Sequence, residues 1–467
     1  MPKCIIDGKE YEFSPGEMII QVGDRNGIEI PRFCYHPALT VVAQCRMCAV
    51  EVEKMPKLQT ACSTPAGDGM IVHTKTEKVK QMQSSVMEFL LINHPLDCPI
   101  CDEAGECTLQ DYSFTYGTPD NRYEEERRTY IDLDMGPVIK KNMNRCIHCT
   151  RCIRFCDEVG GIREMVALKR GNFTEITTVE GKPLETDYAG NLADICPTGS
   201  LTLKDFRFRK RSWFLKKTAS VCEGCSQGCN IEVDQDNGVV YRLRPRENMD
   251  INKWWLCDEG RFNFGYINSS ARIVEPMVRD GAALSEKDWD SAVSEASSKL
   301  KGKVLVLIGS DLTLEEMQTI QKFAATKLGG TASLFHYGTE GVAKTSDDKD
   351  EDKILRRTSK TSNLHGAEKL GLKSWDGNGK YDSALVFRGG RARALTELRK
   401  HVTGAIVGVG VFEKDIAEQM DVVLPGLTYV EKSGTVVNWQ GKEQQFHKAI
   451  DPVGQARSVA DVFALWS

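Results

Sequence analysis

One stretch of the chain, "NRCIHCTRCIRFCDE" at residues 144–158, follows the spacing Cys-x2-Cys-x2-Cys-x3-Cys: Cys146, Cys149, Cys152 and Cys156. In two-cluster bacterial ferredoxins, such a run gives three thiolates to one [4Fe–4S] cluster and the fourth to another cluster. No second run follows here, so a more distant residue must close the first cluster. The closing ligand of the ferredoxin pattern precedes a proline, and Cys196-Pro197 in "DICPTGSL" matches that rule. The sequence therefore predicts one [4Fe–4S] site, called the third site here, formed by Cys146, Cys149, Cys152 and Cys196.

A group nearer the N-terminus combines a Cys-x2-Cys pair with one distant cysteine on each side: Cys34, Cys45, Cys48 and Cys62. This arrangement is typical of a [2Fe–2S] ferredoxin, although the plant-type pattern begins Cys-x4-Cys and the first gap here is ten residues. Thiolates are soft ligands that suit zinc as well as iron–sulfur clusters, so zinc is the alternative. The strand-like runs around these cysteines favour the ferredoxin, and the group is called the first site.

Three cysteines just after a predicted helix, Cys98, Cys101 and Cys107, need a fourth ligand to complete a site. His94 is the candidate for that ligand. His94 stands at the helix end, where Pro95 stops the helix. A neutral imidazole in place of a thiolate makes the site less negative, which raises its reduction potential, as histidine ligation does in Rieske centres. This second site is predicted to hold a [4Fe–4S] cluster, with a structural zinc site of three cysteines and one histidine as the alternative.

A fourth site is predicted from "CEGCSQGCNIEV" and "WWLCDEG", which contribute Cys222, Cys225, Cys229 and Cys257. Cys-x2-Cys-x3-Cys with a distant fourth cysteine suits a [4Fe–4S] cluster, with a zinc ribbon as the alternative. The four sites use fifteen of the seventeen cysteines, and Cys4 and Cys156 remain and are interpreted as structural. Clustered cysteines in a chain without an evident export signal favour metal over disulfides.

The bulk composition fits a soluble globular protein, and 467 residues suffice for three or more domains. A net charge of −5 gives no whole-chain signal for nucleic acid or an anionic membrane. The basic run from Arg207 to Lys217 is an exception, and we interpret it as a solvated or protein-facing surface. The N-terminus lacks the apolar core of a signal peptide, and no apolar run approaches the roughly 18 residues needed to span a bilayer. Any association with a membrane is therefore expected to come through partners.

The order of predicted elements separates a cysteine-rich half from an α/β half. Short strand-like runs predict a β-rich domain up to about residue 78, and a helix over 79–93 places Val79, Met82, Val86 and Leu90 on one face. Further along, buried strands over 303–310, 381–390 and 404–412 alternate with helices over 313–330 and 391–401, which predicts a parallel sheet. The polar segment 339–363 is expected to be exposed or disordered. No Gly-x-Gly-x-x-Gly fingerprint follows a strand, so one-electron transfer is predicted rather than nucleotide chemistry.

Five motifs between residues 22 and 201 together resemble the large iron–sulfur (G) subunits of bacterial NADH:quinone oxidoreductase, respiratory complex I: "GDRNGIEIPRFCYHPAL", "CRMCAVEVE", "HPLDCPICDEAGECTLQD", "RCIHCTRCIRFCDEV" and "ICPTGSL". The fourth-site motifs resemble an extra [4Fe–4S] module that some bacterial members share with molybdopterin oxidoreductases. Molybdopterin oxidoreductases are also resembled, more weakly, by a C-terminal stretch, "MDVVLPGLTYVEKSGTVVNWQGKEQQ". Little more than 200 residues follow Cys257, too few for their complete cofactor fold, so no molybdenum cofactor is expected.

The resemblance implies an α+β multidomain fold with five parts. They are a β-grasp [2Fe–2S] ferredoxin domain (1–78), a [4Fe–4S] domain with one histidine and three cysteine ligands (79–118), a half-ferredoxin [4Fe–4S] domain (119–218), a [4Fe–4S] module of molybdopterin-oxidoreductase type (219–275) and a truncated, cofactor-free α/β domain (276–467). One [2Fe–2S] and three [4Fe–4S] clusters are therefore expected.

The resemblance also implies a path for electrons. Electrons from NADH would pass through flavin on a partner subunit, enter at the first site, reach the third and then the second, and leave to a ferredoxin-like iron–sulfur subunit nearer quinone. The fourth site would lie off this path. The NADH and quinone sites would belong to partner subunits, and none of this chain's residues would be catalytic. The chain would sit peripherally at the cytoplasmic face of the bacterial inner membrane, connected to the membrane arm only through other subunits.

Other redox proteins share parts of this pattern. The diaphorase subunit of an NAD-linked hydrogenase has the N-terminal motifs but usually stops soon after "CPTGSL". An [FeFe]-hydrogenase would need cysteines beyond Cys257, and a formate dehydrogenase would need a complete cofactor domain. A zinc-rich scaffold, the remaining alternative, is separated from all of these by iron and acid-labile sulfide analysis.

Overall fold

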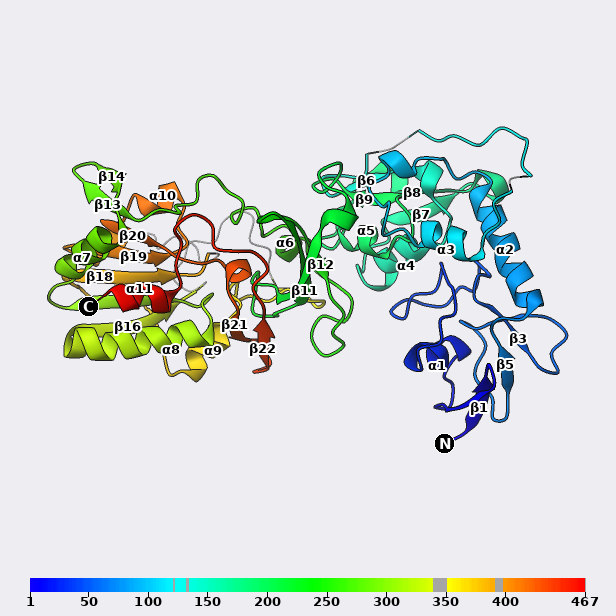
Figure 1. Ribbon diagram of the computed structural model, residues 1–467, viewed down its shortest axis with the longest axis horizontal. Helices are drawn as coiled ribbons and strands as arrows, with labels where there is room; N and C mark the ends of the chain where they lie inside the picture. Colours follow the sequence, from blue (N-terminus) through cyan, green and yellow to red (C-terminus); the bar gives the residue numbers. More distant parts are fainter. Residues whose placement is uncertain (121, 132–133, 339–350, 391–397, 467) are drawn as a thin grey trace. The chain divides into compact units, whose positions relative to one another are not determined.

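The computed structural model describes residues 1–120, 122–131, 134–338, 351–390 and 398–466. The chain forms two units, Met1–Phe214 and Leu215–Ser467, and both mix helices with sheets (Figure 1). The predicted α+β multidomain class is therefore confirmed, whereas the finer division into five domains stays a prediction. None of the helices in the described ranges has the length and apolar character needed to cross a bilayer.

A mixed five-stranded sheet with the order β2-β1-β5-β3-β4 begins the first unit. Its strands are β1 (Lys3–Ile6), β2 (Lys9–Glu12), β3 (Ala49–Val52), β4 (Gln59–Thr60) and β5 (Ile71–His73). Alternate side chains of β1 point to opposite faces of the sheet, so Cys4 and Ile6 lie together in a core. Helix α1 (Ile19–Arg25) contributes Ile20 and Val22 to the same core. The predicted β-rich domain is confirmed, and Cys4 is buried within it.

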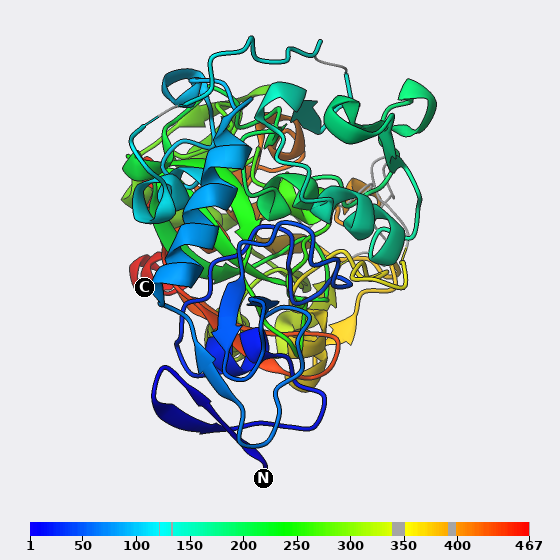
Figure 2. The same ribbon diagram turned by 90° about the vertical axis from the view of Figure 1, so that its right-hand side faces the viewer.

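Helix α2 (Glu77–Leu91) leads from this sheet to the second site and is the long light-blue helix of Figure 2. Thr76 begins it, because the Thr76 hydroxyl accepts the Val79 N–H at 3.4 Å. Val79 and Val86 are buried, and Met82 and Leu90 are partly buried on the same face. The helix predicted over 79–93 is confirmed, with its ends shifted by two residues.

The rest of the first unit has short elements between long loops. They are α3 (Thr108–Tyr116), β6 (Ile139–Lys141), α4 (Arg151–Glu158), β7 (Met165–Leu168), β8 (Glu175–Thr178), α5 (Asn191–Ile195) and β9 (Leu201–Leu203). β6 pairs with β9 and β7 with β8, both antiparallel. Lys141 lies opposite Leu201 in the first pair, which brings the chain before Cys146 and the chain after Cys196 together.

The second unit begins with an antiparallel meander of β10 (Lys216–Val221), β11 (Asn230–Asp236) and β12 (Val239–Pro245). A buried ion pair at 2.7 Å joins Arg242 of β12 to Asp234 of β11. Cys222 follows β10, Cys229 precedes β11, and Cys257 caps the short helix α6 (Asp258–Arg261). The loop between β10 and β11 thus holds three of the four fourth-site cysteines, Cys222, Cys225 and Cys229.

An eight-stranded sheet with the order β14-β13-β20-β19-β18-β15-β16-β17 forms the core of the second unit. Its strands are β13 (Met277–Asp280), β14 (Ala283–Glu286), β15 (Val304–Gly309), β16 (Ala332–Tyr337), β17 (Lys373–Ser374), β18 (Ser383–Arg388), β19 (Ile406–Gly410) and β20 (Val422–Pro425). β15 to β20 run parallel, and β15, β18 and β19 are buried along their whole length, because both faces of such a sheet are covered. The three predicted strands and the parallel sheet are confirmed.

Helices α7 (Trp289–Lys299), α8 (Leu314–Phe323), α9 (Leu364–Lys369) and α11 (Val459–Leu465) pack on this sheet through one apolar core (Figure 1). Thr313 and Glu316 cap α8 reciprocally, and a π-helical turn continues it before Gly329, so the helix predicted over 313–330 is confirmed. Most of the helix predicted over 391–401 lies outside the described residues, and Leu398–Lys400 form a 3-10 turn. Three further elements are α10 (Lys414–Ala417), β21 (Gly434–Val437) and β22 (Glu443–Phe446).

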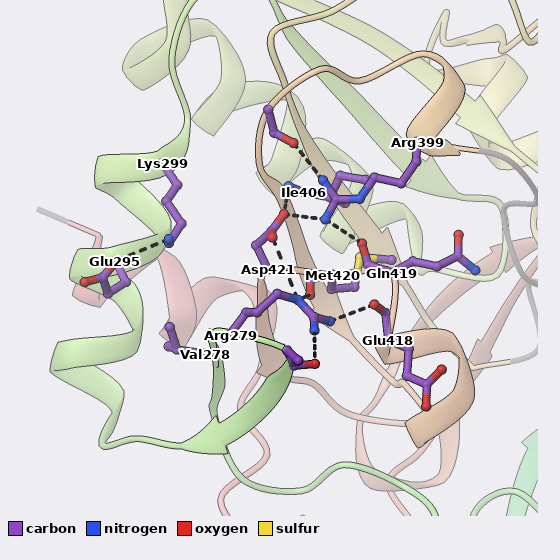
Figure 3. A network of polar contacts seen from close by, with 12 residues as sticks. Val278, Arg279, Glu295, Lys299, Arg399, Ile406, Glu418, Gln419, Met420 and Asp421 are labelled. Carbon is purple, nitrogen blue, oxygen red and sulfur yellow. Dashed lines mark hydrogen bonds and ion pairs between the residues drawn. The ribbon is translucent and has the colours of Figure 1, made fainter.

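Asp421 fixes one end of the sheet through a network of polar contacts (Figure 3). Its carboxylate accepts the Ile406 N–H at 2.8 Å and an Arg399 Nη2 hydrogen bond at 2.6 Å. Arg279 lies 3.9 Å from the other carboxylate oxygen and donates to the Met420 carbonyl at 3.0 Å. The turn before β20 is thereby tied to both β13 and β19.

Candidate iron–sulfur sites

The thiols of the third site line one cavity of about 430 Å³. Three of them come from the loop before α4 and its first turn, and Cys196 directly follows α5. His148 and Thr150 adopt left-handed backbone, with φ of 54° and 59°, which winds the loop between the cysteines. The His148 N–H also donates to Cys146 Sγ at 3.4 Å. The four residues that the sequence predicted as ligands are therefore brought together.

The chemistry of the third site fits a metal–sulfur cluster. Burial raises the pKa of the Cys146 and Cys149 thiols to about 11 and that of Cys196 to about 12, because thiolates are poorly solvated there. A bound cluster displaces those protons and supplies the positive charge that thiolates need. The apolar side chains around the thiols are Met143, Ile147, Met165, Ile176 and Leu201. The donors and their surroundings fit, and the ligand assignment itself stays a prediction.

Cys156 does not belong to the lining of that cavity. It lies further along α4, is 1% exposed, and follows the fully buried Phe155. Burial raises the pKa of its thiol to about 12, so it remains protonated near neutral pH. Cys156 thus packs as a small apolar residue, in agreement with its structural interpretation.

The thiols of the first site form two pairs. Cys34 hydrogen-bonds with Cys45, and Cys48 hydrogen-bonds with Cys62. Because Cys45 accepts from the Cys34 thiol, its pKa falls to about 5, whereas the pKa of Cys34 rises. The Cys34 N–H also points toward Cys45 Sγ at 3.5 Å. Two pairs of cysteines fit a cluster with two irons, each of which takes two protein ligands.

The second site has its three cysteines around the 3-10 turn Cys98–Ile100 and the start of α3. Cys98 is exposed, whereas Cys101 and Cys107 are buried and lie within electrostatic range of each other. Burial, assisted by Arg145, lowers the pKa of His94 to about 4, so the imidazole is neutral near pH 7, as a metal ligand must be. Within the described residues the imidazole makes no hydrogen bond with the three thiols, and its place as the fourth ligand stays a prediction.

The second and third sites share the loop Cys196–Gly199. A Cβ on Gly199 would overlap Cys101 Sγ, so only glycine leaves room for that sulfur. The Cys107 thiol approaches the Pro197 carbonyl at 3.7 Å. A loop of the third site therefore forms one wall of the second.

An ion pair also joins these two sites. Arg145, which precedes Cys146, donates to Asp97, which precedes Cys98, at 2.9 Å. The basic run after residue 206 packs on the same part of the chain, since Arg211 Nη1 donates to the Cys101 carbonyl at 2.6 Å. Arg211 thus contacts the second site, and the interpretation of the basic run as a solvated or protein-facing surface stays a prediction.

The fourth site surrounds a cavity of about 290 Å³, lined by all four of its predicted cysteines. Close packing there requires glycine, because a Cβ on Gly260 would lie 2.9 Å from Cys222 Sγ. Backbone amides donate to the sulfurs: the Gly224 N–H to Cys222 at 3.4 Å and the Gly260 N–H to Cys257 at 3.3 Å. These features fit a [4Fe–4S] cluster. Across the described residues, no three Cys, His, Asp or Glu side chains are placed to hold a single metal ion.

Residues 351–363 pack against the fourth site, so the prediction that segment 339–363 is exposed or disordered is wrong for them; residues 339–350 lie outside the described residues. Leu355 lines the cavity. Three hydrogen bonds join the segment to the site: Ser226 N–H to Ser359 O at 2.9 Å, Arg357 Nε to Gln227 Oε1 at 2.8 Å, and Lys360 Nζ to Glu259 Oε2 at 2.9 Å. The polar composition misled the prediction because buried polar groups with partners do not need solvent.

The strand order of the second unit reverses between β15 and β18, where open α/β sheets bind ligands. Here the Asp311 carboxylate accepts the Gly389 N–H at 3.1 Å, and a Cβ on Gly390 would lie 2.7 Å from the Tyr266 ring. The Asp311 and Tyr266 side chains thus pack against the Gly389–Gly390 turn at this point. This packing favours the expectation that no molybdenum cofactor binds, which stays a prediction.

Several residues that shape the sites were not singled out from the sequence. Gly199 stands within the "CPTG" motif, and Arg151 and Arg154 stand within "CTRCIRFC", so their closeness to ligands was the available signal. Leu355 and Lys360 gave no such signal, because they lie more than ninety residues after Cys257.

Five family models match the chain in succession. They are "2Fe-2S iron-sulfur cluster binding domain" at residues 3–77, "NADH-ubiquinone oxidoreductase-G iron-sulfur binding region" at 83–122, "NADH-quinone oxidoreductase subunit 3, ferredoxin-like domain" at 136–202, "Molybdopterin oxidoreductase Fe4S4 domain" at 215–269 and "Molybdopterin oxidoreductase" at 397–464. These matches confirm that the chain contains [2Fe–2S] and [4Fe–4S] domains.

Relatives with similar sequences carry the same kind of name. The G subunit of NADH-quinone oxidoreductase from Rickettsia bellii is 43% identical over 327 residues, 69% of this chain and 48% of that protein. The protein of the same name from Rickettsia felis is 44% identical over 70% of this chain and 49% of its own length. "NADH-ubiquinone oxidoreductase 75 kDa subunit" of Reclinomonas americana is 37% identical over 78% of this chain and 53% of its own length.

A solved structure of an NAD+-reducing [NiFe]-hydrogenase also matches, at 26% identity and a TM-score of 0.42, over 45% of this chain and 91% of that one. Its identity is lower than that of the G subunits. The chain spans about half the length of the curated relatives it matches. The succession of cluster-binding domains, the geometry of the cysteine sites and these relatives place the chain in the family of the G subunits, the large iron–sulfur subunits, of NADH-quinone oxidoreductase.

Proposed function

We propose that this chain is the iron–sulfur electron-transfer subunit of the peripheral arm of an NADH:quinone oxidoreductase. It passes electrons from a flavin subunit toward quinone through one [2Fe–2S] and three [4Fe–4S] clusters. The observation that carries the proposal is the third site, where cysteines from two distant segments line one apolar cavity. Thiols arranged in this way hold a redox cofactor, and the protein supplies its position and electrostatics.

The ligand sets of the proposal follow the four sites. The first site holds the [2Fe–2S] cluster with Cys34, Cys45, Cys48 and Cys62. The [4Fe–4S] clusters bind to His94, Cys98, Cys101 and Cys107, to Cys146, Cys149, Cys152 and Cys196, and to Cys222, Cys225, Cys229 and Cys257. A cluster held by each of these sets of residues would supply one-electron redox chemistry.

The contribution of the chain itself is to position each cluster, to keep water away and to set its potential. Backbone N–H groups that donate to ligand sulfurs stabilise added negative charge, as His148 does at Cys146 and Gly260 does at Cys257. Burial of the third-site thiols strengthens this effect, because hydrogen bonds are electrostatically stronger in an apolar medium.

The order of transfer within the proposal runs from the first site to the third and then to the second. The contact of Gly199 with Cys101 supports direct transfer between the third and second sites, since it places the Cys196 loop against a second-site sulfur. The exposed Cys98 suits the exit to a ferredoxin-like iron–sulfur subunit. The fourth site belongs to the other unit and serves assembly rather than flux.

The partners in this proposal carry the remaining chemistry. NADH and flavin bind to one partner and quinone is reduced beyond the ferredoxin-like subunit, so no residue of this chain is catalytic. The complex holds the chain peripherally at the cytoplasmic face of the bacterial inner membrane, and the membrane arm meets it only through other subunits. Nucleic acid has no role.

The test is iron, zinc and acid-labile sulfide analysis of the anaerobically purified complex, followed by paramagnetic resonance after reduction with NADH. The expected content is about fourteen irons per chain, from one binuclear and three cubane clusters. Zinc in place of iron, with little sulfide, would refute the proposal. NADH-driven reduction of quinone without hydrogen uptake separates this function from that of a hydrogenase diaphorase subunit.

A further inference from the structure

Arg154 links the backbones of two different cluster sites. Its Nη2 donates to the carbonyl of Cys34 at 2.6 Å and to the carbonyl of Cys149 at 3.2 Å. Cys34 belongs to the first site and Cys149 to the third, and the arginine lies on α4, between them in space. Its Nη1 also donates to the Thr40 carbonyl at 2.5 Å, and the residue is 7% exposed.

Arg151, one turn earlier on α4, makes a similar connection. Its Nη2 donates to the carbonyl of Tyr35, the residue after Cys34, at 2.7 Å. Its Nη1 donates to the carbonyl of Ile195, the residue before Cys196, at 3.2 Å. Two guanidinium groups therefore span the same gap: Arg154 reaches both sites through Nη2, whereas Arg151 uses one terminal nitrogen for each site.

The loop of the first site is held to α4 at its rim as well. The Thr40 N–H donates to Glu158 Oε2 at 2.8 Å, and the Thr40 hydroxyl donates to Glu158 Oε1. The Gln44 amide donates to the His148 carbonyl. We call this contact between the first-site loop and α4 the seam. Arg151 and Arg154 lie at its buried centre, and the contacts of Thr40 and Gln44 lie at its edge.

These positive charges are unusual for a buried seam. The contacts given above for the Arg154 guanidinium are with neutral carbonyls, and the Nε atoms of Arg151 and Arg154 are buried without a hydrogen-bond partner in the described structure. A buried charge that lacks a counter-charge is costly. Anionic groups nearby would compensate it, and the thiols of Cys34, Cys149 and Cys196 lie within electrostatic range of Arg151.

We propose that Arg154 is a positioning residue for electron transfer between the first and third sites: it fixes the separation of the two sites and provides a hydrogen-bonded link between their ligand backbones. The inference rests on the proposed function. In the step concerned, one electron leaves the reduced first-site cluster and arrives at the oxidised third-site cluster, without a bond made or broken and without proton movement. The guanidinium keeps its charge throughout.

Three variants of the full complex test this role. Arg154→Met removes the charge and the link, whereas Arg154→Lys keeps a charge but lacks the rigid planar fork that holds Nη2 at the Cys34 and Cys149 carbonyls while Nη1 donates to Thr40. Arg163→Met is the matched control, because Arg163 is an exposed arginine that pairs with Asp157 at 2.6 Å. For each complex we would measure the amplitude of both cluster signals, their magnetic dipolar coupling, and the rate at which the third-site signal appears after rapid mixing with NADH.

The expected result is full amplitude for both clusters in Arg154→Met and Arg154→Lys, an altered dipolar coupling, and an electron arrival slowed severalfold, because the rate of electron tunnelling falls as the separation of the two clusters grows. Arg163→Met should match the unaltered protein. Full amplitudes with an unchanged rate in Arg154→Met would overturn the proposal, and so would an unaltered rate in Arg154→Lys.

If Arg154→Met does not assemble, Arg154→Lys decides alone. Slower electron arrival with both cluster signals intact supports the positioning role. Loss of either cluster signal overturns it, because the arginine would then be needed to form a site and not to position two sites. Failure of the proposed function is distinct: the unaltered complex would itself lack NADH-reducible cluster signals.

Discussion

Cys146 and Cys196 line the same cavity, although fifty residues separate them in the sequence. The β6–β9 pair explains this closeness, because it joins the chain before Cys146 to the chain after Cys196. Cys156 is only ten residues from Cys146 and yet lies outside that cavity. Strand pairing rather than sequence proximity therefore selects which cysteine can close the third site.

Substitution of these two cysteines should have opposite effects. Cys196→Ser should alter or abolish one cubane signal and slow NADH-driven quinone reduction severely, because a thiolate ligand is lost. Cys156→Ala should leave the iron content and all cubane signals intact, at a cost of about 1 kcal/mol in packing. Paramagnetic resonance and iron analysis of the purified complexes measure both. A cluster that needs Cys156 and tolerates Cys196→Ser would contradict the geometry.

Gly199→Ala should damage the second site although the residue is no ligand. Its new methyl group would overlap Cys101 Sγ, so either the sulfur or the "CPTG" loop must move. We expect about 1–3 kcal/mol of overpacking strain, together with a broadened or lost second-site signal. Gly330→Ala is the control, since a Cβ there meets no atom within 4 Å. An unperturbed second-site signal in Gly199→Ala would show that the contact is absent from the assembled protein.

Much of the fold was predictable because its signals are local, and the proline after Cys196 gave a local signal for a ligand fifty residues from Cys146. The buried strands β15, β18 and β19 are continuous apolar runs, and α2 has a regular apolar face. Cysteine spacing identified which thiols belong together, and the cavities at the third and fourth sites agree with it. Such patterns survive in the sequence because each depends on neighbouring residues.

The contacts between sites were not predictable, because they join residues far apart in the chain. Nothing near Arg154 indicates that it reaches Cys34, 120 residues away. The burial of Lys360 likewise depends on Glu259, 101 residues earlier, and its polar neighbours indicated the opposite. Polar composition predicts the average exposure of a segment, whereas a hydrogen-bond partner in the folded chain allows a particular polar side chain to be buried.

His94→Cys should keep a cubane cluster at the second site and lower its reduction potential. A thiolate adds negative charge beside the cluster where the neutral imidazole added none, so a shift on the order of 100 mV is expected. Redox titration of the second-site signal measures the shift, and NADH oxidation by artificial acceptors at the flavin should be unaffected. A potential that stays the same, or rises, would show that His94 is not a ligand.

The fourth site offers a test of assembly against flux. Leu355 lines its cavity and comes from a segment that also donates from Lys360 to Glu259 of α6, so this segment contacts the site at two places. Binding of metal to a site that is absent from the unfolded chain adds directly to the folding free energy. Cys225→Ala should therefore reduce the amount of assembled complex more than the turnover of the complex that does assemble.

Leu355→Ala should show the same effect in weaker form, because it leaves the four thiols in place and opens the cavity wall, at a cost of about 2–5 kcal/mol. Cys156→Ala, which removes a buried thiol outside every proposed site, is the matched control for the loss of a cysteine. The measurements are the yield of purified complex and the quinone reduction rate per flavin. Normal yield with collapsed turnover in Cys225→Ala would place the fourth cluster on the electron path instead of beside it.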